Sequence, residues 1–156
     1  MSERKKILFV CLGNICRSPM AEGIFRQMAR EMDLNLEFDS CGTGGWHAGE
    51  PPDLRAQECM MRRGKDISDL RARQFERSDF ERFDHILTMD TSNYEDVQRL
   101  ASNHEHRARV TLILEANYPG QNMSVPDPYY GGGEGFDKVY SLLYRSAQTI
   151  LNQFKE

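Results

Sequence analysis

The sequence lacks the features that would place it in a membrane or on a nucleic acid. No apolar run among its 156 residues approaches the ~18 residues that a membrane-spanning helix needs. The apolar run after the basic residues at 4–6 covers only residues 7–10, which is too short for a secretory signal. Acidic residues outnumber basic ones by 24 to 20, which argues against a broad surface for nucleic acid or anionic lipid. We therefore expect a cytoplasmic protein that binds neither membrane nor nucleic acid.

Cysteine is also scarce, with four residues and none after Cys59. In a reducing cytoplasm these residues are expected to be thiols rather than disulfides. Cys41 and Cys59 do not form the close pair that structural zinc requires, so we expect no metal and no other cofactor. Both are predicted to be packing residues of the core. The other two cysteines, Cys11 and Cys16, lie together near the N-terminus.

What the sequence does contain is an alternation of strand and helix patterns. The continuous apolar run 7–10 predicts a strand that is buried on both faces, as in a parallel sheet. Further strands are predicted at 36–41, 85–89 and 110–113, and helices at 18–33, 53–64, 79–83, 94–100 and 136–154. The first predicted helix is capped by Ser18. The second is capped by Asp53 and ends at Gly64. The pattern favours one α/β domain over residues 1–156.

The segment Cys11–Ser18 lies between the first predicted strand and the first predicted helix. At this point of an α/β sheet, the helix N-terminus offers free N–H groups and the positive end of its dipole to an anion. Gly13 and Asn14 tolerate positive φ, which lets successive N–H groups converge on one point. Arg17 adds a guanidinium fork that matches phosphate geometry. The segment therefore predicts a cradle for inorganic phosphate or a similar oxyanion.

Cys11 is placed at the mouth of this cradle. The helix dipole, the N–H groups and Arg17 all favour its thiolate, and Ser18 can donate a hydrogen bond to the sulfur. A thiolate beneath a bound phosphorus is a nucleophile. A Cys-x5-Arg spacing by itself is a weak signal, and the alternative is a buried structural cysteine beside an exposed arginine. The preceding strand and the helix start at 17–19 favour the catalytic interpretation.

The segment Cys11–Ser18 resembles the Cys-x-Gly-Asn-x-Cys-Arg-Ser loop of the low-molecular-weight protein tyrosine phosphatase family. The segment Asp127–Tyr130 resembles the family's Asp-Pro-Tyr-Tyr motif, and the similarity extends over essentially the whole chain. The resemblance implies a three-layer α/β domain with a flavodoxin-like sheet of four parallel strands flanked by helices. It also implies hydrolysis of phosphotyrosine in proteins, and of small aryl phosphates, through a cysteinyl-phosphate. Tyrosine-phosphorylated proteins are then the expected partners.

The same resemblance suggests a role for each matched residue. Cys11 is the expected nucleophile, Arg17 the group that holds the phosphate oxygens, and Asp127 the general acid and then the general base. Cys16 is the expected redox partner of Cys11, forming a reversible disulfide with it. The implied phosphate-binding residues are Leu12, Gly13, Asn14, Ile15, Cys16, Arg17 and Ser18, and the implied pocket walls are Trp46, Tyr129 and Tyr130.

One position departs from the family pattern. Many relatives carry histidine just before an Arg/Lys-Ala-Arg-Gln stretch, where it supports the phosphate loop, but this chain has Leu70 before Arg71–Gln74. We therefore expect the network around Asn14 and Ser40 to close differently, through water. Three of the four histidines, at positions 47, 104 and 106, are predicted to be surface residues.

Two other functions stay open on the sequence alone. A thiol-dependent arsenate reductase shares the fold and the loop, but such enzymes relay electrons through later cysteines, which this chain lacks after Cys59. A non-catalytic phosphoprotein-binding module would usually have lost the nucleophile or the acid. Both Cys11 and Asp127 are present here, so a protein tyrosine phosphatase is the favoured function.

Overall fold

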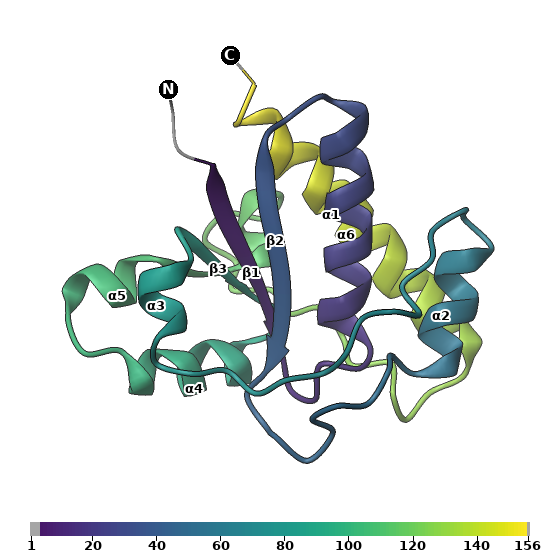
Figure 1. The fold of residues 1–156 in the computed structure, drawn as a ribbon, viewed down its shortest axis with the longest axis horizontal. Helices are drawn as coiled ribbons and strands as arrows, with labels where there is room; N and C mark the ends of the chain where they lie inside the picture. Colours follow the sequence, from purple (N-terminus) through teal and green to yellow (C-terminus); the bar gives the residue numbers. More distant parts are fainter. Residues whose placement is uncertain (1–3, 156) are drawn as a thin grey trace.

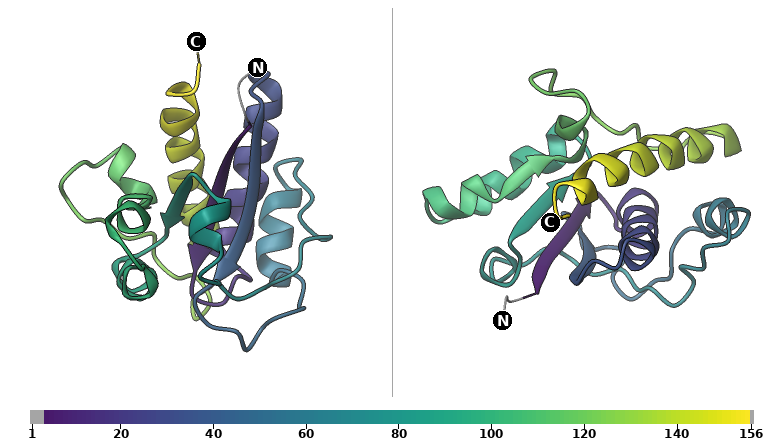
Figure 2. Two further views of the ribbon diagram at one scale, coloured as in Figure 1. Left: turned by 60° about the vertical axis from the view of Figure 1, so that its left-hand side comes forward. Right: turned by 90° about the horizontal axis from the view of Figure 1, so that it is seen from above.

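A four-stranded parallel sheet lies between two layers of helices in the computed structural model, which describes residues 4–155 (Figures 1 and 2). The strands are β1 (Lys5–Cys11), β2 (Leu36–Gly42), β3 (His85–Thr88) and β4 (Val110–Leu112), in the order β2-β1-β3-β4. The helices are α1 (Arg17–Glu31), α2 (Leu54–Met61), α3 (Asp79–Arg82), α4 (Thr91–Leu100), α5 (His104–Ala108) and α6 (Gly133–Asn152), with a 3-10 turn η1 (Ile113–Ala116). The predicted three-layer, flavodoxin-like architecture is confirmed. The ends of the predicted domain, residues 1–3 and 156, lie outside the described residues.

The central position of β1 in the sheet explains why its sequence is apolar without alternation. Ile7 and Phe9 point to the layer that contains α1 and α6, while Leu8 and Val10 point to the layer of α3, α4 and α5. All four side chains are fully buried. Because successive residues of a strand face opposite sides, a strand covered on both sides needs apolar residues at every position. Each buried side chain of this size contributes roughly 1.5–3 kcal/mol to folding.

The strand order places a switch point beside β1. The chain leaves β1 towards β2 on one side and returns to β3 on the other. Ligands of such sheets bind beyond the carboxyl ends of the strands at this point. Cys11 is the last residue of β1, and Asp90 follows the end of β3. The topology therefore brings residues far apart in sequence to one edge of the sheet.

The connection from α2 to α3 runs beside the end of β2. Gly42 donates its N–H to the Arg73 carbonyl (2.9 Å) and accepts a hydrogen bond from the Phe75 N–H (2.7 Å). The Arg73 side chain forms ion pairs with Asp39 and Asp79, each at 3.0 Å. These bonds hold the backbone of this polar segment against the end of β2, which pairs with the end of β1 where Cys11 lies.

Several predicted helix limits are wrong. Ser18 is not the cap of α1, because the helix begins at Arg17 with Cys16 in the cap position. Helix α2 is capped by Asp53 as predicted, but it ends at Met61 rather than at Gly64. Gly64 instead takes a positive φ of 76° in the turn that follows. Helix α6 starts at Gly133, because the glycines there join the helix instead of ending the preceding loop.

Helix α5 has no counterpart among the predicted elements, and His106 within it is not a surface residue. Its side chain is buried, and its ring stacks on Phe80 with centroids 4.8 Å apart. Its Nε2 lies 2.5 Å from a carboxylate oxygen of Glu81. A helix of five residues is too short to show an apolar period, so sequence patterning does not reveal it. His104 is exposed, as predicted.

Within residues 4–155, no helix has both the length and the apolar character that crossing a bilayer requires.

Candidate active site

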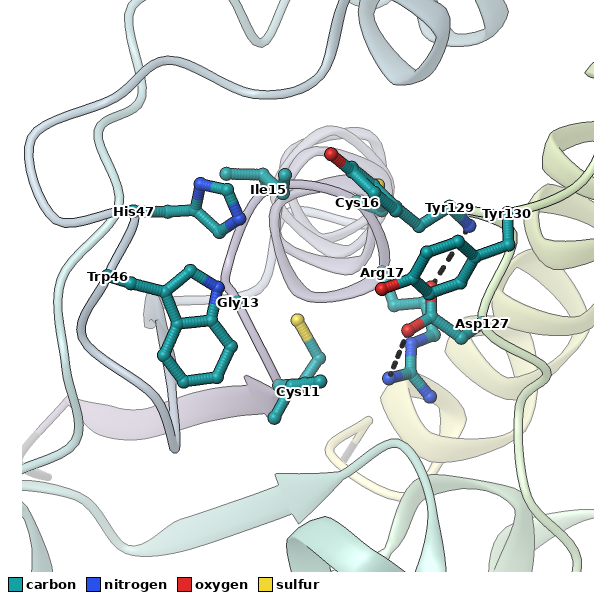
Figure 3. A pocket seen from close by; sticks show the side chains of 11 residues that line it. Cys11, Gly13, Ile15, Cys16, Arg17, Trp46, His47, Asp127, Tyr129 and Tyr130 are labelled. Atoms are coloured by element: carbon teal, nitrogen blue, oxygen red, sulfur yellow. Dashed lines mark hydrogen bonds and ion pairs between the residues drawn. The ribbon is translucent and has the colours of Figure 1, made fainter.

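A pocket of about 290 Å³ opens beyond the carboxyl end of β1 (Figure 3). Three segments distant in sequence form it: the loop between β1 and α1, the loop after β2, and the long loop before α6. The lining residues are Cys11, Leu12, Gly13, Ile15, Cys16, Arg17, Trp46, His47, Asp127, Tyr129 and Tyr130. The fold thus brings together the loop, the aspartate and the aromatic residues that the sequence singles out, and it adds His47.

The loop backbone turns sharply at Asn14. This residue takes a φ of 59°, in the left-handed region that asparagine tolerates better than most residues. Gly13 serves a different purpose, because a Cβ there would lie 2.9 Å from Cδ2 of His47. The loop therefore needs asparagine for its turn and glycine for the close approach of a neighbouring side chain.

The Cys11 sulfur points into the pocket (Figure 3). It receives two polar contacts from below. The Ser18 hydroxyl lies 3.0 Å from the sulfur, and the backbone N–H of Asn14 donates to it at 3.3 Å. The thiol is only 3% exposed. Helix α1 begins at Arg17, which lines the pocket, so the positive end of this helix faces the pocket. Within the described chain no side chain caps it.

A buried hydrogen-bond network beneath the loop holds Asn14 in its unusual conformation. The Asn14 side-chain amide donates to the hydroxyls of Ser18 (2.8 Å) and Ser40 (3.0 Å). Its carbonyl oxygen accepts the backbone N–H of Arg73 at 3.0 Å. Asn14 and Ser18 support the loop from below, and the pocket itself is lined by their neighbours.

The network closes differently from the family pattern, as expected, and Glu22 of α1 takes part in closing it. The Ser40 hydroxyl donates to one Glu22 oxygen at 2.7 Å, and Arg26 lies 2.5 Å from the other. Burial raises the pKa of Glu22, while the Ser40 hydrogen bond and the Arg26 charge act against that rise. Leu70 packs against the core instead. The i, i+4 spacing of Ser18, Glu22 and Arg26 was the signal that could have revealed this role.

Arg17 is held rigidly in a buried position. Its guanidinium donates to a carboxylate oxygen of Asp90 at 2.7 Å and to the Val125 carbonyl at 2.9 Å. Burial acts against its charge, but the negative charges of Cys11, Asp90 and Asp127 raise its pKa. Asp90 was not predicted as a site residue. It also caps α4 by accepting the N–H of Asn93 at 2.7 Å, so it orients Arg17 from a fixed point.

Asp127 lies on the opposite wall from Trp46 and faces the same space as the Cys11 sulfur (Figure 3). One of its oxygens is 3.5 Å from the Arg17 guanidinium, and the other accepts the backbone N–H of Tyr129 at 3.1 Å. The Tyr129 and Tyr130 rings meet edge to face, with centroids 5.0 Å apart. The carboxylate is thus within reach of a group bound over Cys11.

The aromatic residues at the pocket mouth are open to solvent. Trp46 is 64% exposed and Tyr130 92% exposed, although both line the pocket. His47 is half-buried beside Trp46, and its Nδ1 lies 3.0 Å from a carboxylate oxygen of Glu50. His47 therefore forms part of the pocket wall. The prediction of a surface residue did not reveal this place in the pocket.

The chain is similar to known proteins over nearly its whole length. The model of the family described as "Low molecular weight phosphotyrosine protein phosphatase" matches residues 6–156. The chain belongs to this phosphatase family. A family member from Schizosaccharomyces pombe is 44% identical over 154 residues, covering 97% of each chain. A human member is 41% identical over 152 residues, covering 96% of this chain and 95% of its own.

Structural comparison agrees with this membership. A crystal structure of a protein tyrosine phosphatase from Entamoeba histolytica superposes with a TM-score of 0.89 at 33% identity and covers 96% of each chain. In this member of the phosphatase family, residues 4–155 contain no cluster of three or more histidine, cysteine or acidic side chains that could hold a metal ion.

Gly42 supports the phosphate loop of this phosphatase from below, and we expect Gly42→Ala to weaken phosphate binding. A Cβ at this position would lie 2.6 Å from the Leu12 carbonyl oxygen and 3.1 Å from the Asn14 nitrogen. Because these are backbone atoms of the loop, they must shift. We expect the free energy of unfolding to fall by about 1–3 kcal/mol. We also expect the inhibition constant of inorganic phosphate to rise about tenfold, equivalent to ~1.4 kcal/mol.

The matched control is Gly23→Ala in α1. A Cβ there meets only the side-chain tips of Ile67 and Met60, at 2.6 and 2.7 Å. This variant is expected to lose some stability and to keep its phosphate inhibition constant. Thermal unfolding and competitive inhibition measure the two effects. An unchanged inhibition constant in the Gly42 variant contradicts the argument.

Proposed function

We propose that this protein hydrolyses phosphotyrosine in proteins, and small aryl phosphates, through a cysteinyl-phosphate intermediate. The observation that carries the proposal is one pocket in which the Cys11 sulfur, the Arg17 guanidinium and the Asp127 carboxyl face the same space. The names of the yeast and human relatives, both phosphotyrosine protein phosphatases, support the same substrate class.

The first step transfers the phosphoryl group to sulfur. The Cys11 thiolate attacks phosphorus in line, so that the S–P bond forms as the P–O bond to the phenol breaks. Asp127 donates its proton to the departing phenolate oxygen. Cys16 does not compete as nucleophile, because burial and the negative charges of Asp53, Cys11 and Asp127 raise its pKa and keep it a thiol. The step ends with the free phenol and a phosphorylated Cys11.

The second step returns the enzyme to its starting state. Asp127, now a carboxylate, removes a proton from water as the water oxygen attacks phosphorus. The S–P bond breaks, and the products are inorganic phosphate and the Cys11 thiolate. In both steps the Arg17 fork and the N–H groups of residues 12–18 hold the equatorial oxygens, where charge is redistributed in the transition state. Asp90 keeps that fork in place through its 2.7 Å bond.

The shape of the pocket favours an aryl phosphate over an alkyl one. Cys11 is buried at the bottom, while Trp46 and Tyr130 stand exposed at the mouth on opposite sides (Figure 3). A tyrosine ring spans this depth and lies between the aromatic walls. A serine side chain is too short to bring its phosphate to Cys11 while its backbone remains outside.

We also infer that Cys16 protects Cys11 in a reducing compartment such as the cytoplasm. Both thiols are buried and line the same pocket, and no described cysteine is in a disulfide. A peroxide transfers one oxygen to the Cys11 thiolate, which becomes a sulfenic acid while the peroxide is reduced to water or an alcohol. The Cys16 thiol then condenses with the sulfenic acid, which forms the S–S bond and releases water. A cellular dithiol reduces it again.

The proposed function is tested with two peptides of the same sequence that carry phosphotyrosine or phosphoserine. We expect kcat/KM to be at least about 100-fold higher for phosphotyrosine, a difference of ~2.7 kcal/mol. Acid quenching during turnover is expected to leave a phosphoryl group on Cys11, detected by mass spectrometry of the intact chain. Equal turnover of the two peptides, or turnover with no cysteine adduct at short times, would reject the proposal. Tight phosphotyrosine binding without turnover would indicate a binding module instead.

A further inference from the structure

Arg55, in the first turn of α2, contacts the loop that carries Asp127. Its guanidinium donates to the carbonyl oxygens of Tyr129 (2.9 Å) and Gly131 (3.2 Å). Helix α2 lies beside the N-terminal end of α6, where this loop enters the helix (Figure 1). An arginine from a separate element thus binds two backbone carbonyls of the segment that follows the proposed general acid.

The Arg55 side chain is itself fixed on three sides. Asp53 accepts two hydrogen bonds from the guanidinium, both at 3.0 Å, and also caps α2 through the backbone N–H of Arg55 at 2.8 Å. The guanidinium carbon lies 4.9 Å from the centre of the Phe136 ring and 5.5 Å from that of Tyr129. The planar fork is therefore pre-organised by a bidentate ion pair and by two aromatic faces, which lysine could not reproduce.

The same unit is attached to the phosphate-binding loop. The backbone N–H of Asp53 donates to the Ile15 carbonyl at 2.8 Å. A continuous chain of contacts therefore runs from the loop of Cys11, through Asp53 and Arg55, to the loop of Asp127. It joins the two halves of the proposed machinery.

The segment 128–132 has few other attachments. The remaining backbone hydrogen bonds of this segment in the described chain stay within it, or reach Asp127 and the start of α6. The side chains of Tyr129 and Tyr130 are partly or largely open to solvent. Among the described residues, the two bonds from Arg55 are therefore the hydrogen bonds that tie this segment to a different part of the molecule.

We propose that Arg55 is a positioning residue, which holds the 127–132 loop over the phosphate-binding loop so that Asp127 meets the oxygen of the leaving group. Arg55 touches no reacting atom and acts through the loop. The inference rests on the proposed phosphatase function. It predicts a particular kind of defect: loss of proton donation to the leaving group, with phosphate binding and the nucleophile intact.

Leaving-group dependence separates this role from general support of the fold. The phenolate of phenyl phosphate has a conjugate-acid pKa near 10, so it needs a proton to leave, whereas dinitrophenolate leaves without one. The parameter kcat/KM reports the steps up to P–O cleavage. We expect Arg55→Met to lower kcat/KM about tenfold or more for phenyl phosphate and less than about threefold for dinitrophenyl phosphate, since a positioned acid contributes roughly 10²–10⁴.

Arg62→Met is the matched control. Arg62 follows α2 at its other end and pairs with Asp137 of α6 at 3.1 Å, so its loss removes one arginine and one α2–α6 contact without touching the loop. We expect it to leave both substrates unaffected. Arg55→Lys is the second variant in case Arg55→Met does not fold, and it is expected to show a smaller loss of the same selectivity. A uniform loss for both substrates overturns the proposal.

A double-mutant cycle completes the test. If Arg55 acts through Asp127, then Arg55→Met is expected to cost almost nothing further in an Asp127→Ala background. Fully additive losses would overturn the positioning role while leaving the phosphatase function intact. A wild-type protein that turns over neither aryl phosphate would instead reject the proposed function itself, so the two failures are distinguishable.

Discussion

Cys11→Ser is expected to lower kcat for a phosphotyrosine peptide by about 10⁴-fold or more, as removal of a catalytic nucleophile does in comparable enzymes. A serine hydroxyl is a much weaker nucleophile than a cysteine sulfur, and the sulfur of Cys11 is the atom that Ser18 and Asn14 contact, at 3.0 and 3.3 Å. The substitution changes one buried atom, so the phosphate cradle stays intact. Steady-state kinetics gives the loss, and equilibrium binding of the phosphopeptide is expected to persist.

Cys59→Ser is the control for this prediction. Cys59 is equally buried, but it lies in α2 and points its sulfur at the Phe136 carbonyl and the Asp137 carboxylate, each 3.6 Å away. A serine hydroxyl can make the same hydrogen bonds, so turnover is expected to stay near wild type. Substantial turnover by the Cys11 variant would rule out the cysteinyl-phosphate route. The same variant used as a trap in a native extract would identify tyrosine-phosphorylated partners.

Asp127→Ala is expected to lower kcat/KM for the phosphotyrosine peptide by about 10²–10³-fold, within the range for general acid catalysis. The leaving phenolate is a strong base, and the carboxyl of Asp127 is the acidic group that lines the pocket beside Arg17 at 3.5 Å. Dinitrophenyl phosphate is expected to lose much less, because its leaving group needs no proton. The ratio of the two kcat/KM values is therefore the measurement.

Asp137→Ala serves as the matched acidic control. This residue lies in α6 and pairs with Arg62 and Arg63 at 3.1 Å, away from the pocket lining. We expect it to change neither substrate. Equal losses of the two aryl phosphates in the Asp127 variant would show that this carboxyl does not protonate the leaving group.

The layers of the fold were predictable because their physical causes are local. The unbroken apolar run of β1 needs cover on both faces whatever its partners are. Asp53 before α2 and the apolar period of α6 likewise act within a few residues. Helix limits were less predictable. Cys16 rather than Ser18 occupies the cap position of α1, because the turn at Asn14 and the contacts of the loop outweigh the local preference of serine for a cap.

Sequence reasoning did not find the supporting residues of the site, and only Glu22 left a signal, in its i, i+4 spacing from Ser18 and to Arg26. Asp90 next to Arg17, Glu22 beneath Ser40, and Arg55 against the acid loop each act on a partner that is distant along the chain. Charged residues of these types are common on solvated surfaces, so their identity alone signals nothing. Only a specific partner in the folded structure distinguishes them.

By itself, the sequence determined the alternation of strand and helix and the anion-binding loop that begins at Cys11, because these depend on residue types and short spacings. The distant Asp127 was indicated by the resemblance to the phosphatase family. The tertiary structure decided the rest. It set the strand order that brings Arg17 to Asp90, and it closed the loop network on Glu22 in the absence of the family histidine. It also placed Arg55 between the two loops. Hydrogen bonds and ion pairs of this kind require atoms within about 3 Å of each other, and only the packing of the layers sets those distances.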